Sequence, residues 1–268
     1  MRNIVIAALF LLATAPSAVA ATLPANAEYS INLTGDIEIA PDGSVHSYAL
    51  DDGLKPQVQK LVSTSIEGWR FEPILVDGRA VIARTRLRMA LKAVPAADGY
   101  ALKVDKVWFG EPSRTSLMSP PRYPTDAARS GVGARVVLVL RIDAMGNVVD
   151  VHPEQTSLTM KAGGKTADRW RRMFETASLA SARQWKFDIP EIIDGAPAES
   201  TGIRVPVDFM MGGVPGQWHG FVPGPTVPAP WMDQRKALAS ATHALEEGDM
   251  QPLDSRFKLQ TEVVGMVL

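Results

Sequence analysis

The strongest constraint on the fold is one order of signals that occurs twice along the chain. In the first half, the turn pair Asp42-Gly43 precedes a helical stretch, the motif WRFEP at residues 69–73 and a second turn pair at residues 77–78. In the second half, Gly146-Asn147 precedes a helical stretch, the motif WKFD at residues 185–188 and Asp194-Gly195. Because one supersecondary unit gives one such order, the repetition predicts two copies of a single unit.

Within each copy, the hydrophobic period predicts strands on both sides of a helix. Apolar residues alternate along residues 136–142, 81–91 and 203–209, which is the period of two of a strand with one buried face. Apolar residues between 58 and 66 and between 170 and 177 fall on one helix face. We therefore predict an α+β fold of two tandem modules, each a three-stranded antiparallel sheet with packed helices.

The same signals predict the boundaries along the chain. We expect a first module at residues 28–110, a linker at 111–120, a second module at 121–211 and a tail at 212–268. Alternation over residues 100–109 adds a strand to the first module. The tail is rich in Pro at its start and then predicts a helix at about 232–247 and an alternating stretch at 257–263, compatible with an edge strand of either sheet.

The first 20 residues have the layout of a secretory signal. Arg2 is followed by an uncharged, mainly apolar run at residues 4–15 and by the small-x-small sequence Ala18-Val19-Ala20. The apolar run is short for a membrane span. We predict cleavage of residues 1–20 and a periplasmic protein; the alternative is an uncleaved segment anchored in the inner membrane.

Composition excludes several kinds of chemistry. The chain has no Cys, which excludes a thiol nucleophile, a Cys-ligated zinc and an iron–sulfur cluster. The formal charge of −1 does not predict a nucleic-acid partner. The four His lack metal-ligand spacing, and Gly163-Gly164-Lys165-Thr166 lacks the first Gly of a phosphate loop. We predict no catalytic residue, no metal and no cofactor, and therefore no enzyme.

One strand of the first module carries a row of cations on one face. The row consists of Arg84, Arg86, Arg88 and Lys92. A solvated face that discourages aggregation is the simpler interpretation, and an acidic envelope partner is the alternative.

The second module resembles the C-terminal domain of TonB, the inner-membrane energy transducer that contacts outer-membrane transporters. The elements that carry this resemblance are PRYP at residues 121–124, Ala127-Ala128, Gly131, the strand at 136–142, Gly146-Asn147-Val148 and Trp185-Lys186-Phe187. The similarity covers about residues 120–211. The first module resembles the same domain through Asp42-Gly43 and WRFEP, but it lacks the Tyr-Pro helix start and looks degenerate.

The resemblance implies two helices on a three-stranded antiparallel sheet, and a partner that adds an extended segment as a strand to the sheet edge. Carried over by position, the partner-binding residues would be Tyr123, Pro124, Ile203, Arg204, Val205, Val207 and Phe209. The implied partner is an envelope protein or an outer-membrane receptor peptide. Two other functions stay open: a membrane-anchored energy transducer for TonB-dependent transport, and a structural or dimerisation module of the envelope that could form a homodimer.

Overall fold

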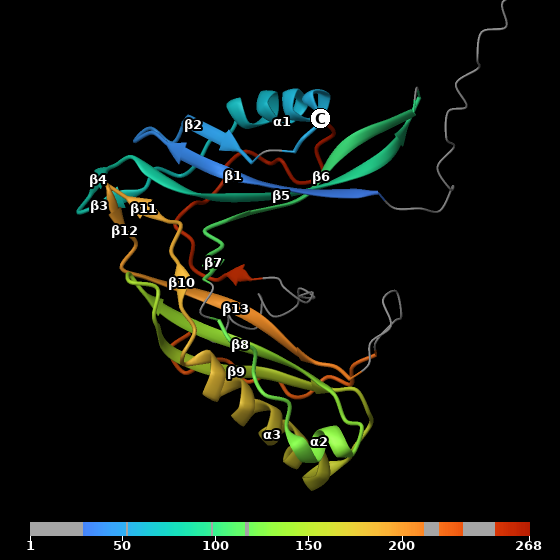
Figure 1. Ribbon diagram of the computed structural model, residues 1–268. Coiled ribbons are helices and arrows are strands. Elements are labelled where there is room, and N and C mark those ends of the chain that lie inside the picture. Colours follow the sequence, from blue (N-terminus) through green and yellow to red (C-terminus); the bar gives the residue numbers. More distant parts are fainter. Residues whose placement is uncertain (1–28, 52, 98, 116–117, 212–219, 233–249) are drawn as a thin grey trace, which may run out of the picture.

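The computed structural model of the protein describes residues 29–51, 53–97, 99–115, 118–211, 220–232 and 250–268 (Figure 1). The predicted signal segment at 1–20 and nearly all of the predicted helix at 232–247 lie outside these residues. Two antiparallel sheets carry the fold, each with a helix on one face. Along the described chain, the structure has no helix with the length and apolarity that a membrane crossing needs.

The first sheet is built mainly from the first half of the chain. β1 (Ser30–Ile39) pairs with β2 (Val45–Leu50) on one side and with β5 (Ala83–Ala96) on the other. β6 (Gly99–Phe109) pairs with the far side of β5, as the alternation had predicted. α1 (Pro56–Glu67) contributes Val62 and Ile66 to the core. A small hairpin, β3 (Leu75–Val76) and β4 (Arg79–Ala80), precedes β5.

The second sheet is centred on β8 (Ala134–Asp143), which lies between β9 (Val148–Leu158) and β13 (Ser200–Phe209). The short α2 (Thr125–Arg129) precedes β8, and α3 (Gly164–Ala182) packs on one face through Phe174. β14 (Gln251–Pro252) pairs with only Ile203 and Arg204 on the outer edge of β13.

The α+β class with antiparallel sheets is confirmed, but the predicted sheets of three strands are too small. The first sheet has six strands and the second has four. The difference arises because distant segments add to each sheet. In the described part of the first half, α1 is the one α-helix, whereas the resemblance implied two.

The two Trp-x-Phe motifs have matching surroundings. The Phe71 N–H donates to the Gly43 carbonyl at 2.8 Å, and the Phe187 N–H donates to the Gly146 carbonyl at 2.9 Å. Gly43 and Gly146 have φ values of 81° and 83°. A Cβ there would lie 2.1 Å from the Phe71 oxygen and 1.9 Å from the Phe187 oxygen. The turn and the motif therefore meet in the same way in both halves.

Each half also pairs with a segment that comes from outside it. The hairpin of β11 (Ile192–Ile193) and β12 (Ala196–Pro197) leaves the second half and pairs with β5 at Ala83 and Arg84. In return, β7 (Ser113–Arg114) of the predicted linker pairs with β10 (Phe187–Asp188). Residues 113 and 114 of the predicted linker are therefore paired with a strand of the second half.

The C-terminal segment, Met250–Leu268, connects the two sheets (red in Figure 1). After β14 it crosses to the first sheet, where the Glu72 N–H donates to the Lys258 carbonyl at 2.9 Å and Phe257 packs in the first core. Its last residue donates to the Leu102 carbonyl on the outer edge of β6 at 2.8 Å. The alternating stretch at 257–263 thus lies against the first sheet.

Candidate functional site

The sheet edges differ in what they leave unpaired. The outer edge of β5 is bordered by β11 at Ala83 and Arg84 and by β6 from Leu87 onward. The outer edge of β9 is bordered by residues 220–227, where Val222 and Leu158 exchange two backbone hydrogen bonds of 2.7 and 3.1 Å. The Pro-rich part of the tail that the structure describes therefore covers an edge.

β13 is bordered over only part of its length. β14 pairs at Ile203 and Arg204, and among the described residues no strand pairs with the outer edge from Val205 to Phe209, which we call the open stretch. Strands β5 and β13 can be aligned through their central neighbours. Ile39 pairs with Ala83 in the first half, and Ile142, four residues before Gly146 as Ile39 is before Gly43, pairs with Thr201 in the second. By this correspondence the open stretch matches residues 87–91 of β5, which β6 covers.

A groove of about 550 Å³ runs along the open stretch. Its other lining residues are Met118, Ser119, Pro120, Pro121 and Trp185. The Trp185 indole N–H donates to the Ser119 carbonyl at 2.9 Å, and the Ser181 hydroxyl donates to the same oxygen at 2.7 Å. These bonds fix the wall, and its two prolines have no N–H with which to pair the strand.

The backbone direction along β13 follows from Gly202. Its N–H donates to the Asp254 carboxylate at 2.7 Å and its carbonyl accepts from the Leu253 N–H at 2.9 Å, so both groups point to the outer edge. Because the two groups of a strand residue share a side and the sides alternate, Pro206 and Asp208 also point outward. The Pro206 carbonyl and both backbone groups of Asp208 therefore point toward the outer edge, where Pro206 is buried and Asp208 is half-buried beside the groove.

The side chains predicted to bind a partner on β13 are mostly inside the protein. Ile203, Val205 and Phe209 are buried in the second core, and Val207 is half-buried. Arg204 is 2% exposed and pairs with Glu154 of β9. What β13 can offer a partner is its backbone edge, with Val207 beside it.

Tyr123 and Pro124 do not line the groove but pack in the second core and begin α2. The Tyr123 hydroxyl donates to the Val132 carbonyl at 2.8 Å, and its ring meets Phe174 and Phe209 edge to face. Desolvation by burial raises the pKa of Tyr123. Pro124 is the N-cap of α2. The groove is instead lined by the preceding residues 118–121, of which 118–120 were predicted to belong to the linker.

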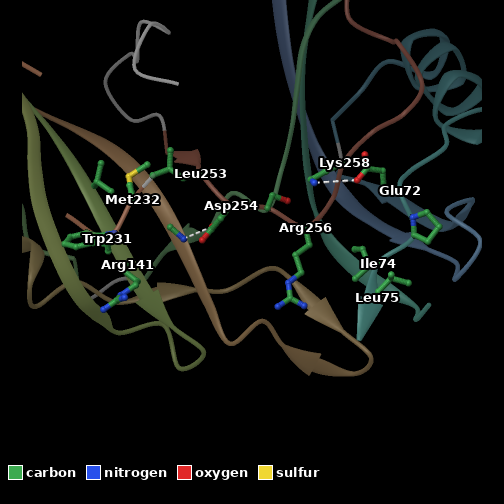
Figure 2. Close-up of a pocket in the computed structure, with 14 residues that line it drawn as sticks. Glu72, Ile74, Leu75, Arg141, Trp231, Met232, Leu253, Asp254, Arg256 and Lys258 are labelled. Carbon is green, nitrogen blue, oxygen red and sulfur yellow. Dashed lines mark hydrogen bonds and ion pairs between the residues drawn. The ribbon is translucent and has the colours of Figure 1, made fainter. Parts of the chain in front are cut away.

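A larger cavity of about 860 Å³ lies between the two sheets (Figure 2). Among its charged groups, Lys258 pairs with Glu72 at 3.5 Å, Arg141 pairs with Asp150, and Asp254 accepts from the Gly202 N–H. In the described part of the chain, no three His, Asp or Glu side chains gather closely enough to hold a metal ion. We place the candidate site at the groove because there, among the described residues, a cavity adjoins the unpaired edge of β13.

The row of cations on β5 is largely neutralised. Arg86 pairs with Asp36 at 3.4 Å. Arg88 pairs with Glu111 at 3.2 Å, and Lys92 pairs with Asp105 at 3.4 Å. This pattern favours the interpretation as a solvated face.

Comparison with known proteins gives relatives over part of the chain. No family model matches the chain, and no solved structure is significantly similar to it. Protein TonB of Xanthomonas campestris pv. campestris is 35% identical over 94 residues, which are 35% of this chain and 36% of the relative. Protein TonB of Vibrio cholerae serotype O1 is 27% identical over 119 residues, 44% of this chain and 43% of the relative. The chain therefore spans less than half the length of these relatives, and the matches support a TonB-like family.

Proposed function

We propose that the protein binds an extended peptide segment of an envelope partner, such as an outer-membrane receptor, by strand addition to β13. The open stretch is the main support for this proposal. On β5, the equivalent edge is paired with β6, and this pairing is a model for how a guest strand would lie on β13. The similarity to TonB proteins supports the class of partner and a site of action in the periplasm.

We propose further that residues 28–110 and 121–211 are divergent copies of one TonB C-terminal-like unit. The matching bonds of Gly43 and Gly146 support this relationship. On this view the first copy is complemented by its own β6 and serves as a scaffold, while the second copy receives the guest. The guest would run antiparallel to β13, as β6 runs antiparallel to β5.

Energetics make such an interaction weak unless the groove contributes. A hydrogen bond adds about 0.5–1.5 kcal/mol net, and the open stretch offers three backbone groups. Burial of an apolar guest side chain against Trp185 and Met118 would supply additional free energy in proportion to the area removed from water. The expected complex is therefore transient.

The direct test is a titration of the isotopically labelled protein with synthetic peptides from the plug termini of outer-membrane receptors. We expect the amide resonances of Val205 and of residues 207–209 to shift and hydrogen exchange of the Asp208 amide to slow. Tyr48 on β2, at an edge of the other sheet, serves as a control and should not respond. Unchanged resonances of residues 205–209 at millimolar peptide would contradict the proposal.

A second candidate is a membrane-anchored energy transducer, which is favoured by the name that the matching relatives share. This candidate requires residues 1–20 to remain on the protein. The intact mass of the protein purified from envelopes separates the two: loss of these residues excludes the anchored form.

A further inference from the structure

The groove also limits what kind of segment β13 can accept, provided that strand addition occurs there. We propose that the guest is a short, uncharged strand with one bulky apolar side chain, and that Pro206 and β14 together fix its register. Three features of β13 carry this inference: where its edge is already occupied, which backbone groups it offers, and what lies beside the groove.

The occupied part of the edge sets the guest's length. β14 pairs with Arg204 through Gln251, and the Leu253 N–H is bonded to the Gly202 carbonyl. A guest strand that runs along the open stretch must leave the edge when it reaches Arg204. Five residues remain, a span of about 17 Å.

The backbone groups then set the register. A guest residue opposite Asp208 can exchange two hydrogen bonds with it, as in an antiparallel ladder. A guest residue opposite Pro206 can donate its N–H to the Pro206 carbonyl, but its own carbonyl receives nothing, because proline has no N–H. The guest residue with the unmatched carbonyl must therefore lie where the guest turns away from the edge.

The residues around the groove determine which side chains the guest can carry. A guest residue opposite Val207 places its side chain on the same face as Val207, where Met118 and Trp185 line the groove. These neighbours are apolar, so a charged side chain would lose hydration without gaining a partner.

The guest residues on either side of that position point to the opposite face. There, Asp208 already accepts two hydrogen bonds from Arg135, with Nε–Oδ1 and Nη2–Oδ2 distances of 2.7 and 2.6 Å. Because the Asp208 charge is matched, a charged guest residue gains nothing from it. Small polar residues fit these two positions.

The probe for this inference is an acetylated, amidated peptide of seven residues with leucine at the central position and threonine at the other six. N-methylation at one residue at a time removes one donor from the probe. Methylation of either threonine beside the central leucine should weaken binding about two- to tenfold, because those N–H groups face β13. Methylation of the central leucine should change affinity less, since its N–H points away from the strand.

Two protein variants complete the test. Pro206→Ala supplies the missing donor and should strengthen binding of the unmodified probe about two- to tenfold. Pro197→Ala is the matched control, because it adds an N–H to the exposed strand β12 outside the groove, and it should leave affinity unchanged. Far-UV circular dichroism and urea midpoints verify that both variants fold.

An alternating methylation profile together with a gain for Pro206→Ala supports the inference. A flat profile and no gain, while the Asp208 amide still responds to the probe, would overturn the fixed register and leave strand addition standing. Failure of the probe and of every receptor peptide to bind would overturn both.

Discussion

Arg204 and Glu154 form a buried, bidentate ion pair that reaches across the central strand of the second sheet. Arg204 Nε lies 2.5 Å from Glu154 Oε2 and Nη2 lies 2.7 Å from Oε1, and each side chain is 2% exposed. Arg204 Nη1 also donates to the Gln251 side chain of β14 at 2.9 Å. One guanidinium thus connects β9, β13 and the strand that limits the groove.

Arg204→Met should destabilise the protein by about 3–5 kcal/mol, because it leaves the Glu154 carboxylate buried without its partner. The double variant Arg204→Met with Glu154→Leu should recover most of this loss, since no buried charge remains. Urea unfolding measures both. A loss below about 1 kcal/mol for the single variant would show that the carboxylate finds other donors or water.

Gly146→Ala should cost more stability than Gly195→Ala. Both glycines have positive φ, 83° and 81°, so both substitutions carry the left-handed penalty of about 1–2 kcal/mol. A Cβ at position 146 would also meet the Phe187 carbonyl at 1.9 Å, whereas nothing lies within 4 Å of one at position 195. Equal free energies of unfolding for the two variants would contradict the close approach of turn and motif.

Ile193→Ala should destabilise the whole protein by about 2–5 kcal/mol in one transition. Ile193 comes from the second half, yet it is 6% exposed within the core of the first sheet. Val149→Ala is the control, because Val149 is 51% exposed on β9. Calorimetry that resolves two transitions, with only one of them shifted, would show that the halves unfold independently.

Stability should fall as pH rises above the ordinary range of a glutamate, because of Glu191. Desolvation by burial raises its pKa, while hydrogen bonds from the Ser255 hydroxyl and the Arg256 N–H oppose that shift. Between the unfolded pKa and the raised folded pKa, the native state binds more protons than the unfolded state, so the free energy of unfolding decreases with pH.

The matched variant is Glu191→Gln, which keeps a hydrogen-bond acceptor and removes the charge. Its urea midpoint should exceed that of the wild type near neutral pH and converge with it below pH about 4. Identical pH profiles between pH 4 and 8 would remove Glu191 as the cause.

Local chemistry made much of the fold predictable. Positive φ at Gly43 and Gly146 was expected of tight turns, and the alternation at residues 100–109 predicted β6. The partners of distant segments were not predictable. Nothing near Ile193 or Phe257 indicates that they pack in the first core, because that choice depends on shape and burial after the chain has collapsed.

The proposed site lies on the strand that the resemblance indicated, but the contacts of its individual residues could not be predicted from the sequence. The resemblance indicated β13, but period-two alternation does not tell which edge stays open or that Arg204 is buried with Glu154. Residues 111–120 look like a linker because they contain Pro and Ser, and this stretch includes residues 118–120 of the groove. The available signal was Pro206, since a proline inside a strand indicates an edge position.

The path of the C-terminal segment has a consequence for biosynthesis. Phe71 packs against Phe257, and the Glu72 N–H donates to the Lys258 carbonyl, so residues translated late cover the first core, most of which is translated early. In a nascent chain, the part of the first core around Phe71 therefore stays exposed until these residues have been synthesised. A prematurely terminated product would lack the covering segment and would expose an apolar surface to proteases and chaperones.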